Sequence, residues 1–342
     1  MLPTKEIKLG LGISFTSVQS IVPLFKISTR RPHTNALGYF LHTLWLFTVS
    51  DLKTFVVPEA LFGILGALSG PLLTNNLRPS VCLIASQVPK VFLWTWLNTL
   101  VFDLSNQRHL ESVAEDRLNK PFRPLAAGRI TPSQTRNLLL VSVPVLLMVT
   151  YFYLGSYEET VLLISVTWMY NDLGGSDGHF VVRNLIIGIA YIIYGSGALR
   201  VASYCVLENY GLNTSGYVWS CIIGAVICTT IQVQDLKDKE GDRTRNRHTA
   251  PLALGDECAR WTIAFPVAFW SVFCSLFWQL GICLSVSLIS FGMVIAVRVV
   301  CLKGFSADRK TWKLWSYWLA VLYVLPVVNR YLYFEPEVAG HV

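Results

Sequence analysis

The stretch WTIAFPVAFWSVFCSLFWQLGICLSVSLISFGMVIAV, residues 261–297, contains no charged side chain. An α-helix needs roughly 20 apolar residues to cross a hydrocarbon core about 30 Å thick. The stretch is too long for one such helix, and Gln279 and Gly281 near its middle favour a break there. The sequence therefore predicts two membrane helices joined by a short turn.

The composition of the whole chain agrees with a membrane protein. Of the 342 residues, 53% are hydrophobic and 14% are charged, whereas soluble proteins carry roughly 25% charged residues. The mean hydropathy is +0.49. This composition excludes intrinsic disorder, collagen-like and coiled-coil structures, and most soluble folds.

Uncharged or nearly uncharged stretches elsewhere supply the remaining spans. We predict an all-α, polytopic integral membrane protein with nine transmembrane helices within 53–78, 81–102, 137–157, 160–171, 184–207, 209–234, 261–297 (two helices) and 314–329. The fourth span, 160–171, is short and can cross the membrane only if flanking residues extend the helix. The predicted organisation is a cytosolic segment 1–34, an interfacial helix 35–50, a nine-helix catalytic domain 51–334 and a tail 335–342.

The basic residues indicate the orientation of these helices. With nine spans, every Lys and Arg except Lys53, Arg78, Lys90, Arg200 and Arg330 lies on one side of the membrane. Because cytoplasmic loops accumulate Lys and Arg, this side is predicted to be cytosolic. We predict an integral, multi-pass membrane protein, located in the endoplasmic reticulum if the chain is eukaryotic. The first 25 residues show no cleaved signal, and the eight scattered cysteines show no metal-binding spacing.

Acidic residues gather in two loops on this basic side. After the sixth span, Asp235, Asp238 and Asp242 are spaced i, i+3, i+7, which places the three carboxylates on one face of a helix. Magnesium ions prefer oxygen ligands and are commonly held by carboxylates together with substrate phosphates. This loop therefore predicts a Mg²⁺ and phosphate site.

The loop after the second span has a similar character. Its candidate metal ligands are Asn106, Glu111, Glu115 and Asp116. Facing acidic helices can hold a metal–diphosphate complex, whose remaining charge would be neutralised by basic neighbours, namely Lys120, Arg123, Lys239, Arg243 and Arg247. The alternative is that both loops are solvated, salt-bridged helix ends.

These two loops resemble the motifs of the UbiA superfamily of intramembrane prenyltransferases. The segment Asp235-Leu-Lys-Asp238-Lys-Glu-Gly-Asp242-Arg243 matches the family's DxxDxxxD motif, and Asp116-Arg-Leu-Asn-Lys-Pro-Phe-Arg-Pro124 resembles the tail of its first motif. The resemblance implies a nine-helix bundle and Mg²⁺-dependent ionisation of an isoprenyl diphosphate. It implies catalytic roles for the motif residues Asn106, Asp116, Asp235, Asp238 and Asp242.

The first motif departs from the usual NDxxDxxxD pattern. Gln107 follows Asn106, and Glu111 and Glu115 stand where Asp is usual. Asn106, Glu115 and Asp116 are the favoured metal ligands of this loop. The altered motif resembles the fungal branch of the superfamily, which contains membrane-bound terpene cyclases alongside prenyltransferases that use an acceptor.

The leading hypothesis is a terpene cyclase that ionises farnesyl or geranylgeranyl diphosphate and releases diphosphate. The second is transfer of the isoprenyl chain to an aromatic acceptor. The third is a transporter with an intramembrane charge path through Asp51, Lys53, Glu59 and Arg200. The expected partners are the diphosphate substrate and membrane lipid, with no nucleic acid and no obligatory protein partner.

Further candidates complete the predicted site. A cyclase needs aromatic faces around its carbocation, and the candidates are Trp94, Trp96, Trp168, Tyr170, Tyr191, Tyr194 and Trp219, each of which can instead serve packing or the membrane interface. The Gly-rich loop that carries Asp172 and His179 lies on the same face and is either a lid or an ordinary turn.

Overall fold

The computed structural model describes residues 36–204, 211–245 and 247–334. The chain divides into two units, residues 1–40 and 41–342. Of the first unit, the structure describes Ala36–Phe40, which form the start of a helix; the core and the cavity belong to the second unit. The predicted segments 1–34 and 335–342 lie outside the described residues.

The described chain is helical, with isolated β-bridges but no strand in the described ranges. The α-helices are α1 (Ala36–Asp51), α2 (Val57–Leu68), α3 (Val81–Gln107), α4 (Leu110–Asn119), α5 (Pro132–Val149), α6 (Tyr157–Asn171), α7 (Phe180–Ser203), α8 (Thr214–Thr230), α9 (Asp235–Thr244), α10 (Ala250–Ala253), α11 (Asp256–Phe277), α12 (Ile282–Cys301) and α13 (Phe305–Asn329). Short 3-10 or π-helical turns extend several of them, namely Leu52–Val56, Gly70–Leu72, Thr150–Leu154, Ile231–Gln234 and Arg330–Phe334.

Local sequence signals account for several helix boundaries. Thr131 caps α5 in a reciprocal capping box with Gln134, and Pro132 occupies the first turn. The turn between α11 and α12 falls at Gln279, which adopts a φ of 47°, so the predicted break near Gln279 and Gly281 is confirmed.

Each predicted span contains a helix, which confirms the all-α membrane class. Within the described ranges, five helical segments are long and apolar enough to cross a membrane, namely Pro132–Leu154, Phe180–Ser203, Thr214–Thr244, Asp256–Phe277 and Ile282–Cys301. The count of nine crossings stays a prediction, because α2 and α6 are shorter and α3 and α13 more polar. A helix, α1, forms at the predicted position and continues through the π-helical turn into α2, and its interfacial location stays a prediction.

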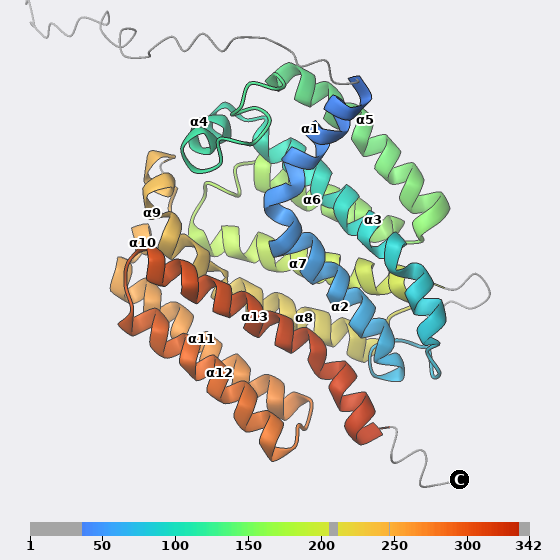
Figure 1. Cartoon of the computed structure of the whole chain (residues 1–342). Coiled ribbons are helices and arrows are strands. Elements are labelled where there is room, and N and C mark those ends of the chain that lie inside the picture. The colour runs from blue at the N-terminus through green and yellow to red at the C-terminus, as the bar shows by residue number, and fades with distance from the viewer. Residues whose placement is uncertain (1–35, 205–210, 246, 335–342) are drawn as a thin grey trace, which may run out of the picture. The chain divides into compact units, whose positions relative to one another are not determined.

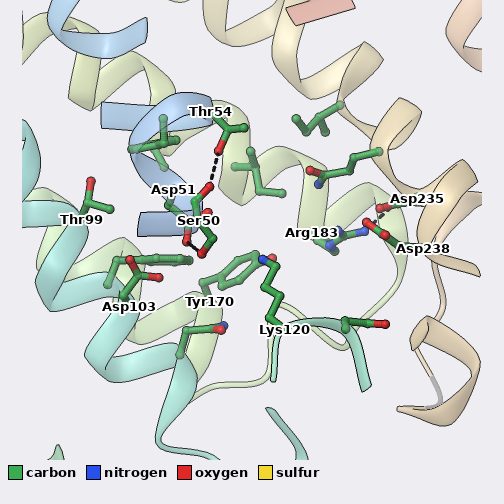
Figure 2. A pocket seen from close by; sticks show the side chains of 18 of the residues that line it. Ser50, Asp51, Thr54, Thr99, Asp103, Lys120, Tyr170, Arg183, Asp235 and Asp238 are labelled. Carbon is green, nitrogen blue, oxygen red and sulfur yellow. Dashed lines mark hydrogen bonds and ion pairs between the residues drawn. The ribbon is translucent and has the colours of Figure 1, made fainter. Parts of the chain in front are cut away.

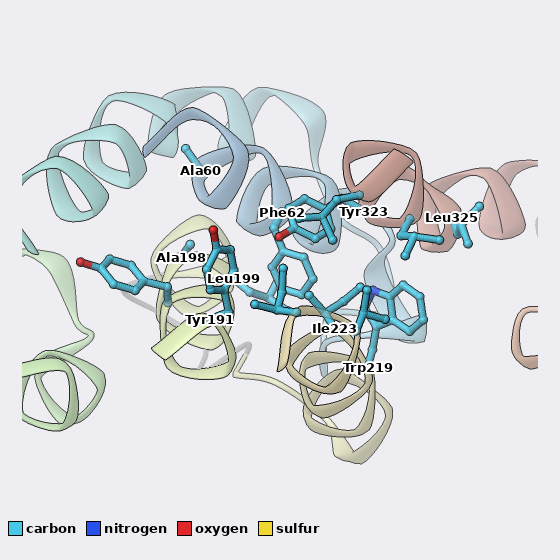
Figure 3. Close-up of a cluster of buried hydrophobic side chains, with 14 of the residues drawn as sticks. Ala60, Phe62, Tyr191, Ala198, Leu199, Trp219, Ile223, Tyr323 and Leu325 are labelled. Atoms are coloured by element: carbon cyan, nitrogen blue, oxygen red, sulfur yellow. The ribbon is translucent and has the colours of Figure 1, made fainter. Parts of the chain in front are cut away.

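The core lies where α2, α7, α8 and α13 meet (Figure 1). Figure 3 shows Phe62 of α2, Leu199 of α7, Trp219 of α8 and Tyr323 of α13 in one buried cluster. A Cβ atom on Gly63 would lie 2.5 Å from the carbonyl carbon of Ala198 in α7. A glycine is therefore required where these two helices cross.

Apolar side chains also cover the outside of the bundle. Leu140 and Val141 of α5 are 63% and 61% exposed, and Ile282 and Val286 of α12 are 83% and 58% exposed. Such surfaces are unfavourable in water, and lipid is the solvent that suits them.

Candidate active site

Both predicted motifs border one cavity of about 610 Å³. Its walls come from the end of α1 and from α3, α4, α6, α7, α9 and α13. Figure 2 shows Asp103 of α3, Tyr170 of α6, Arg183 of α7 and Asp235 of α9 converging on it. Segments far apart in the sequence thus form the walls of a single cavity.

The second motif forms helix α9, as its spacing predicts. Asp235, Asp238 and Asp242 all border the cavity. Asp235 and Asp242 are 1% and 3% exposed, whereas the Asp238 side chain is 46% exposed and pairs with Lys237. The three carboxylates therefore share one face of the helix and differ in access to water.

Arg183 holds the first of these carboxylates. Its Nη1 atom donates to Oδ2 of Asp235 over 2.8 Å, and the two side chains are 7% and 2% exposed. Arg183 stands in the first turn of α7 and borders the cavity. Sequence reasoning missed this residue, although it follows closely on the Gly-rich loop that carries Asp172 and His179.

The first motif occupies the end of α3 and the short helix α4. Asn106 borders the cavity and donates through Nδ2 to Oδ1 of Asn171 over 2.8 Å. Asp116, Glu115 and Lys120 border it as well, whereas Glu111 is exposed in the first turn of α4 and does not. Asn106 and the part of the motif around Asp116 therefore face the cavity, whereas Glu111 does not.

Arg123 links the first motif to the end of α1. Its Nη1 donates to Oδ1 of Asp116 over 3.0 Å, and its Nη2 donates to Oδ2 of Asp51 over 3.2 Å. Burial raises the pKa of the Asp116 carboxyl, and the opposing effect of Arg123 does not fully offset it. Burial lowers the pKa of the Arg123 guanidinium, but Asp51 and Asp116 raise it above its ordinary value. Arg123 therefore stays charged at the cavity wall.

A network of ion pairs spans the loops around the cavity. Arg245 binds Glu115 over 3.1 Å and Asp177 over 2.9 Å, and Arg247 binds Glu115 over 3.3 Å, Asp177 over 3.2 Å and Asp242 over 3.2 Å. Burial alone would raise the pKa of the Asp177 carboxyl, but the two guanidinium groups lower it below its ordinary value. Residues of α4, the α6–α7 loop and the loop after α9 are thus joined.

Other predicted residues lie away from the cavity. Lys239 pairs with Asp256 over 2.6 Å, and Arg243 is exposed at the end of α9. Asp172 pairs with Arg108, and His179 caps α7 by accepting from the backbone N–H of Val181. None of these four candidate residues borders the cavity.

The oxygen donors around the cavity suit Mg²⁺. In the described ranges, no three His, Cys, Asp or Glu side chains converge as a metal cluster within the protein alone. The oxygen atoms of the motif residues border one cavity, and Oδ2 of Asp242 is buried without a hydrogen-bond partner among the described residues. Because Mg²⁺ usually takes one or two carboxylates and completes its shell with phosphates and water, these donors fit it.

The other part of the cavity is apolar and aromatic. Phe55 contacts both tyrosines, Tyr191 and Tyr194, with ring centroids 5.0 Å apart for Phe55–Tyr191 and 4.5 Å apart for Phe55–Tyr194. Trp315 of α13 borders the cavity as well, whereas the Trp312 ring faces Nζ of Lys237 at 4.9 Å, beside the second motif. Of the predicted aromatic residues, Tyr170, Tyr191 and Tyr194 border the cavity.

The predicted tryptophans lie elsewhere. Trp94 and Trp96 donate to Thr160 and Thr48, each over 3.0 Å. Trp219 packs in the core beside Phe277, and Trp168 is 55% exposed. Helix packing therefore accounts for the positions of Trp94, Trp96 and Trp219, and Trp168 belongs to the outer surface.

The charges of the transporter hypothesis have separate partners. Glu59 accepts a hydrogen bond from the Tyr323 hydroxyl over 2.9 Å, while Arg200 pairs with Glu159 over 2.8 Å. Asp51 pairs with Arg123, and Lys53 is exposed. Glu59, Arg200 and Asp51 thus have separate local partners, and these contacts do not connect the three residues into a path.

Comparisons with known proteins agree with this architecture. The model of the UbiA prenyltransferase family matches residues 64–318. Fumagillin β-trans-bergamotene synthase of Aspergillus fumigatus is 30% identical over 303 residues, covering 85% of this chain and 93% of that protein. A polyprenyl transferase of Hericium erinaceus is 28% identical over 288 residues, covering 83% and 93%.

A solved structure shows the same fold. The UbiA homologue of Archaeoglobus fulgidus bound to GPP and Mg²⁺ has a TM-score of 0.55 at 12% identity, over 84% of this chain and 99% of that one. The family match covers most of the chain and includes both motif helices at the cavity. The chain belongs to the UbiA prenyltransferase family.

Proposed function

We propose that this protein is a Mg²⁺-dependent membrane terpene cyclase that ionises a linear isoprenyl diphosphate and cyclises the chain. The observation that carries the proposal is the division of one cavity into a charged end and an aromatic end. The relatives support it by name, among them a bergamotene synthase. Farnesyl and geranylgeranyl diphosphate are the substrates that we propose.

The charged end suits a diphosphate. Lys120, Arg123, Arg183 and Arg247 border it and can neutralise the phosphate oxygens. Asn106, Asp116, Asp235, Asp238 and Asp242 would hold Mg²⁺, which when bound supplies positive charge to the leaving diphosphate. Arg183 keeps Asp235 in place, and Arg123 does the same for Asp116. Diphosphate leaves with the electron pair of the C–O bond and an allylic cation remains.

The aromatic end suits this cation. The faces of Phe55, Tyr191, Tyr194 and Trp315 can stabilise positive charge by cation–π interaction, worth about 2 kcal/mol for a desolvated contact. Exclusion of water favours attack by the substrate's own double bonds over hydrolysis.

Transfer of the chain to an aromatic acceptor is the second candidate function. It is favoured by the polyprenyl transferase relative, which matches the chain over nearly the same length as the cyclase relative. Both functions share the ionisation step and differ in the nucleophile that captures the cation.

One assay separates these functions. Microsomes that contain the full chain are given farnesyl or geranylgeranyl diphosphate with Mg²⁺ and no acceptor. A cyclic hydrocarbon supports the cyclase, product that forms only with an added aromatic supports the transferase, and no diphosphate release in either case refutes both.

The site assignment has its own test. Asp235→Ala and Asp238→Ala are each expected to abolish turnover while membrane insertion is retained. The matched control is Glu257→Gln, which alters an exposed carboxylate paired with Lys303 outside the cavity. Activity retained in both aspartate variants contradicts the assignment.

The proposed orientation places the motif helices at the cytosolic face, in the endoplasmic reticulum membrane of a eukaryotic cell. The basic loops support this orientation. A glycosylation acceptor inserted in the α11–α12 turn is expected to be modified, whereas one inserted in the α6–α7 loop is not. The reverse pattern would contradict the orientation.

A further inference from the structure

A second pair of carboxyl groups borders the cavity outside both motifs. Asp103 lies in α3 and Asp51 at the end of α1 (Figure 2). Asp103 is 1% exposed, whereas the Asp51 side chain is 28% exposed. Neither residue belongs to a motif, because Asp103 precedes the first motif and Asp51 lies far from it in the sequence.

The two carboxyl groups differ in their partners. Asp51 binds Arg123 over 3.2 Å and accepts from the Ser50 hydroxyl over 3.0 Å, both through Oδ2. Oδ1 of Asp103 accepts from Nε2 of Gln107 over 3.3 Å. Oδ2 of Asp103 is buried, and no hydrogen-bond partner for it occurs among the residues that the structure describes. The pair thus has one buried oxygen at the cavity wall that can take a proton.

Asp51 stabilises a proton placed on that oxygen. Two carboxylates are both acceptors, so a hydrogen bond between Asp103 and Asp51 requires that one of them be protonated. Because Arg123 pairs with Asp51, an Asp103 that has received the product proton can donate a hydrogen bond to the Asp51 carboxylate. The greater exposure of Asp51 then gives the proton a route to water.

Asp103 lies on α3 between two residues that border different parts of the cavity. Asn106 and Thr99 border the same cavity, three residues after and four residues before Asp103. At 1.5 Å per residue, Asp103 lies about 5 Å along the helix from the motif level and about 6 Å from Thr99. Because Thr99 shares a side-chain hydrogen bond with Tyr194, Asp103 stands between the diphosphate end and the aromatic end.

We propose that Asp103, assisted by Asp51, accepts the proton that ends the cyclisation. The inference rests on the proposed cyclase function. The C–O bond to diphosphate breaks with its electron pair, and an alkene π pair forms a new C–C bond. A C–H bond beside the final cation then supplies its electron pair to a new double bond, and the proton passes to Oδ2 of the ionised Asp103 carboxylate. No oxidant or reductant is needed. The competing proton acceptor is the released diphosphate.

The test compares Asp103→Asn with the wild-type chain in the microsomal assay, and measures diphosphate release and the product ratio separately. Asparagine keeps the oxygen that accepts from Gln107 but removes the basic oxygen. Since a positioned base contributes about 10²–10⁴-fold to proton transfer, the share of the wild-type hydrocarbon is expected to fall about tenfold or more. Alcohols or isomeric alkenes replace it, while diphosphate release stays within about threefold of wild type.

Two results would overturn the inference. An unchanged product ratio assigns the proton to diphosphate, and a loss of release with an unchanged ratio assigns Asp103 to binding or folding. If Asp103→Asn does not reach the membrane, Asp51→Asn is measured instead and must shift the ratio in the same direction. If the wild-type chain yields no cyclic product, the cyclase function itself is refuted. Glu257→Gln is the control and is expected to leave the product ratio unchanged.

Discussion

The pair between Arg183 and Asp235 is expected to couple the start of α7 to the second motif. In Arg183→Gln, a polar side chain remains but the charge is lost. Asp235 is then a carboxylate at 1% exposure without a cationic partner. An isolated charge in such a position is strongly unfavourable, so the variant tests whether the pair organises the site.

The structure sets the size of the effect. Two unit charges 2.8 Å apart attract each other by about 6 kcal/mol at an effective dielectric constant of about 20. Desolvation offsets part of this attraction, and removal of one partner from a buried pair typically costs about 3–5 kcal/mol. We expect Arg183→Gln to lower the free energy of unfolding by that amount. Displacement of Asp235 is expected to lower diphosphate release on the order of 10²-fold.

A double-mutant cycle provides the measurement. Wild type, Arg183→Gln, Asp235→Asn and the double variant are unfolded in detergent micelles, and the double variant is expected to cost at least about 2 kcal/mol less than the sum of the single variants. Lys303→Gln, which alters a pair whose side chains are 49% and 66% exposed, is the control and should cost about 1 kcal/mol or less. Additivity within about 0.5 kcal/mol would refute the coupling.

Three further predictions concern stability, pH and metal. Asp308→Asn removes the carboxylate that binds buried Arg260 through contacts of 2.9 and 3.0 Å, while Asp256 still binds the same guanidinium over 2.9 Å. The variant is expected to lower the free energy of unfolding by about 1.5–3 kcal/mol in denaturant titrations, and a loss under about 0.5 kcal/mol would contradict this. The lowered pKa of Asp177 means that its stabilising pairs with Arg245 and Arg247 are complete above the ordinary value of 3.8 and are lost as pH falls through the lower folded value. Asp177→Asn should therefore flatten the acid side of the stability profile, and an identical profile would argue against the network. Chelation by EDTA should stop diphosphate release and excess Mg²⁺ should restore it; release that persists in EDTA would exclude the metal.

Much of the fold follows from short-range sequence patterns. The uncharged stretch 261–297 predicts two helices and the turn between them, because the length of the stretch and the Gln and Gly near its middle are local features of the sequence. The end of α3 is harder to predict. Asp103 and Gln107 continue the helix beyond the apolar span, since the surrounding helices bury them at 1% and 0% exposure. Tertiary burial of this kind leaves no local signal.

The candidate site likewise combines features that the sequence spacing predicts with contacts that it does not predict. Spacing places Asp235, Asp238 and Asp242 on one face of a helix, because the helical repeat depends on sequence alone. Spacing does not reveal which cation faces them. Arg183 lies 52 residues before Asp235, and that contact depends on how α7 packs against the turn before α9.

The contacts of Glu115 explain physically why the first motif carries a glutamate at this position. Its Oε2 accepts from Arg245 and its Oε1 from Arg247, over 3.1 and 3.3 Å. Arg247 also binds Asp242, so one guanidinium joins the first motif to the second. A glutamate extends one methylene further than an aspartate, which suits a contact across the loops, while its neighbour Asp116 faces the cavity beside Arg123. The two adjacent carboxylates thus have different surroundings: Glu115 joins the loops, and Asp116 faces the cavity beside Arg123.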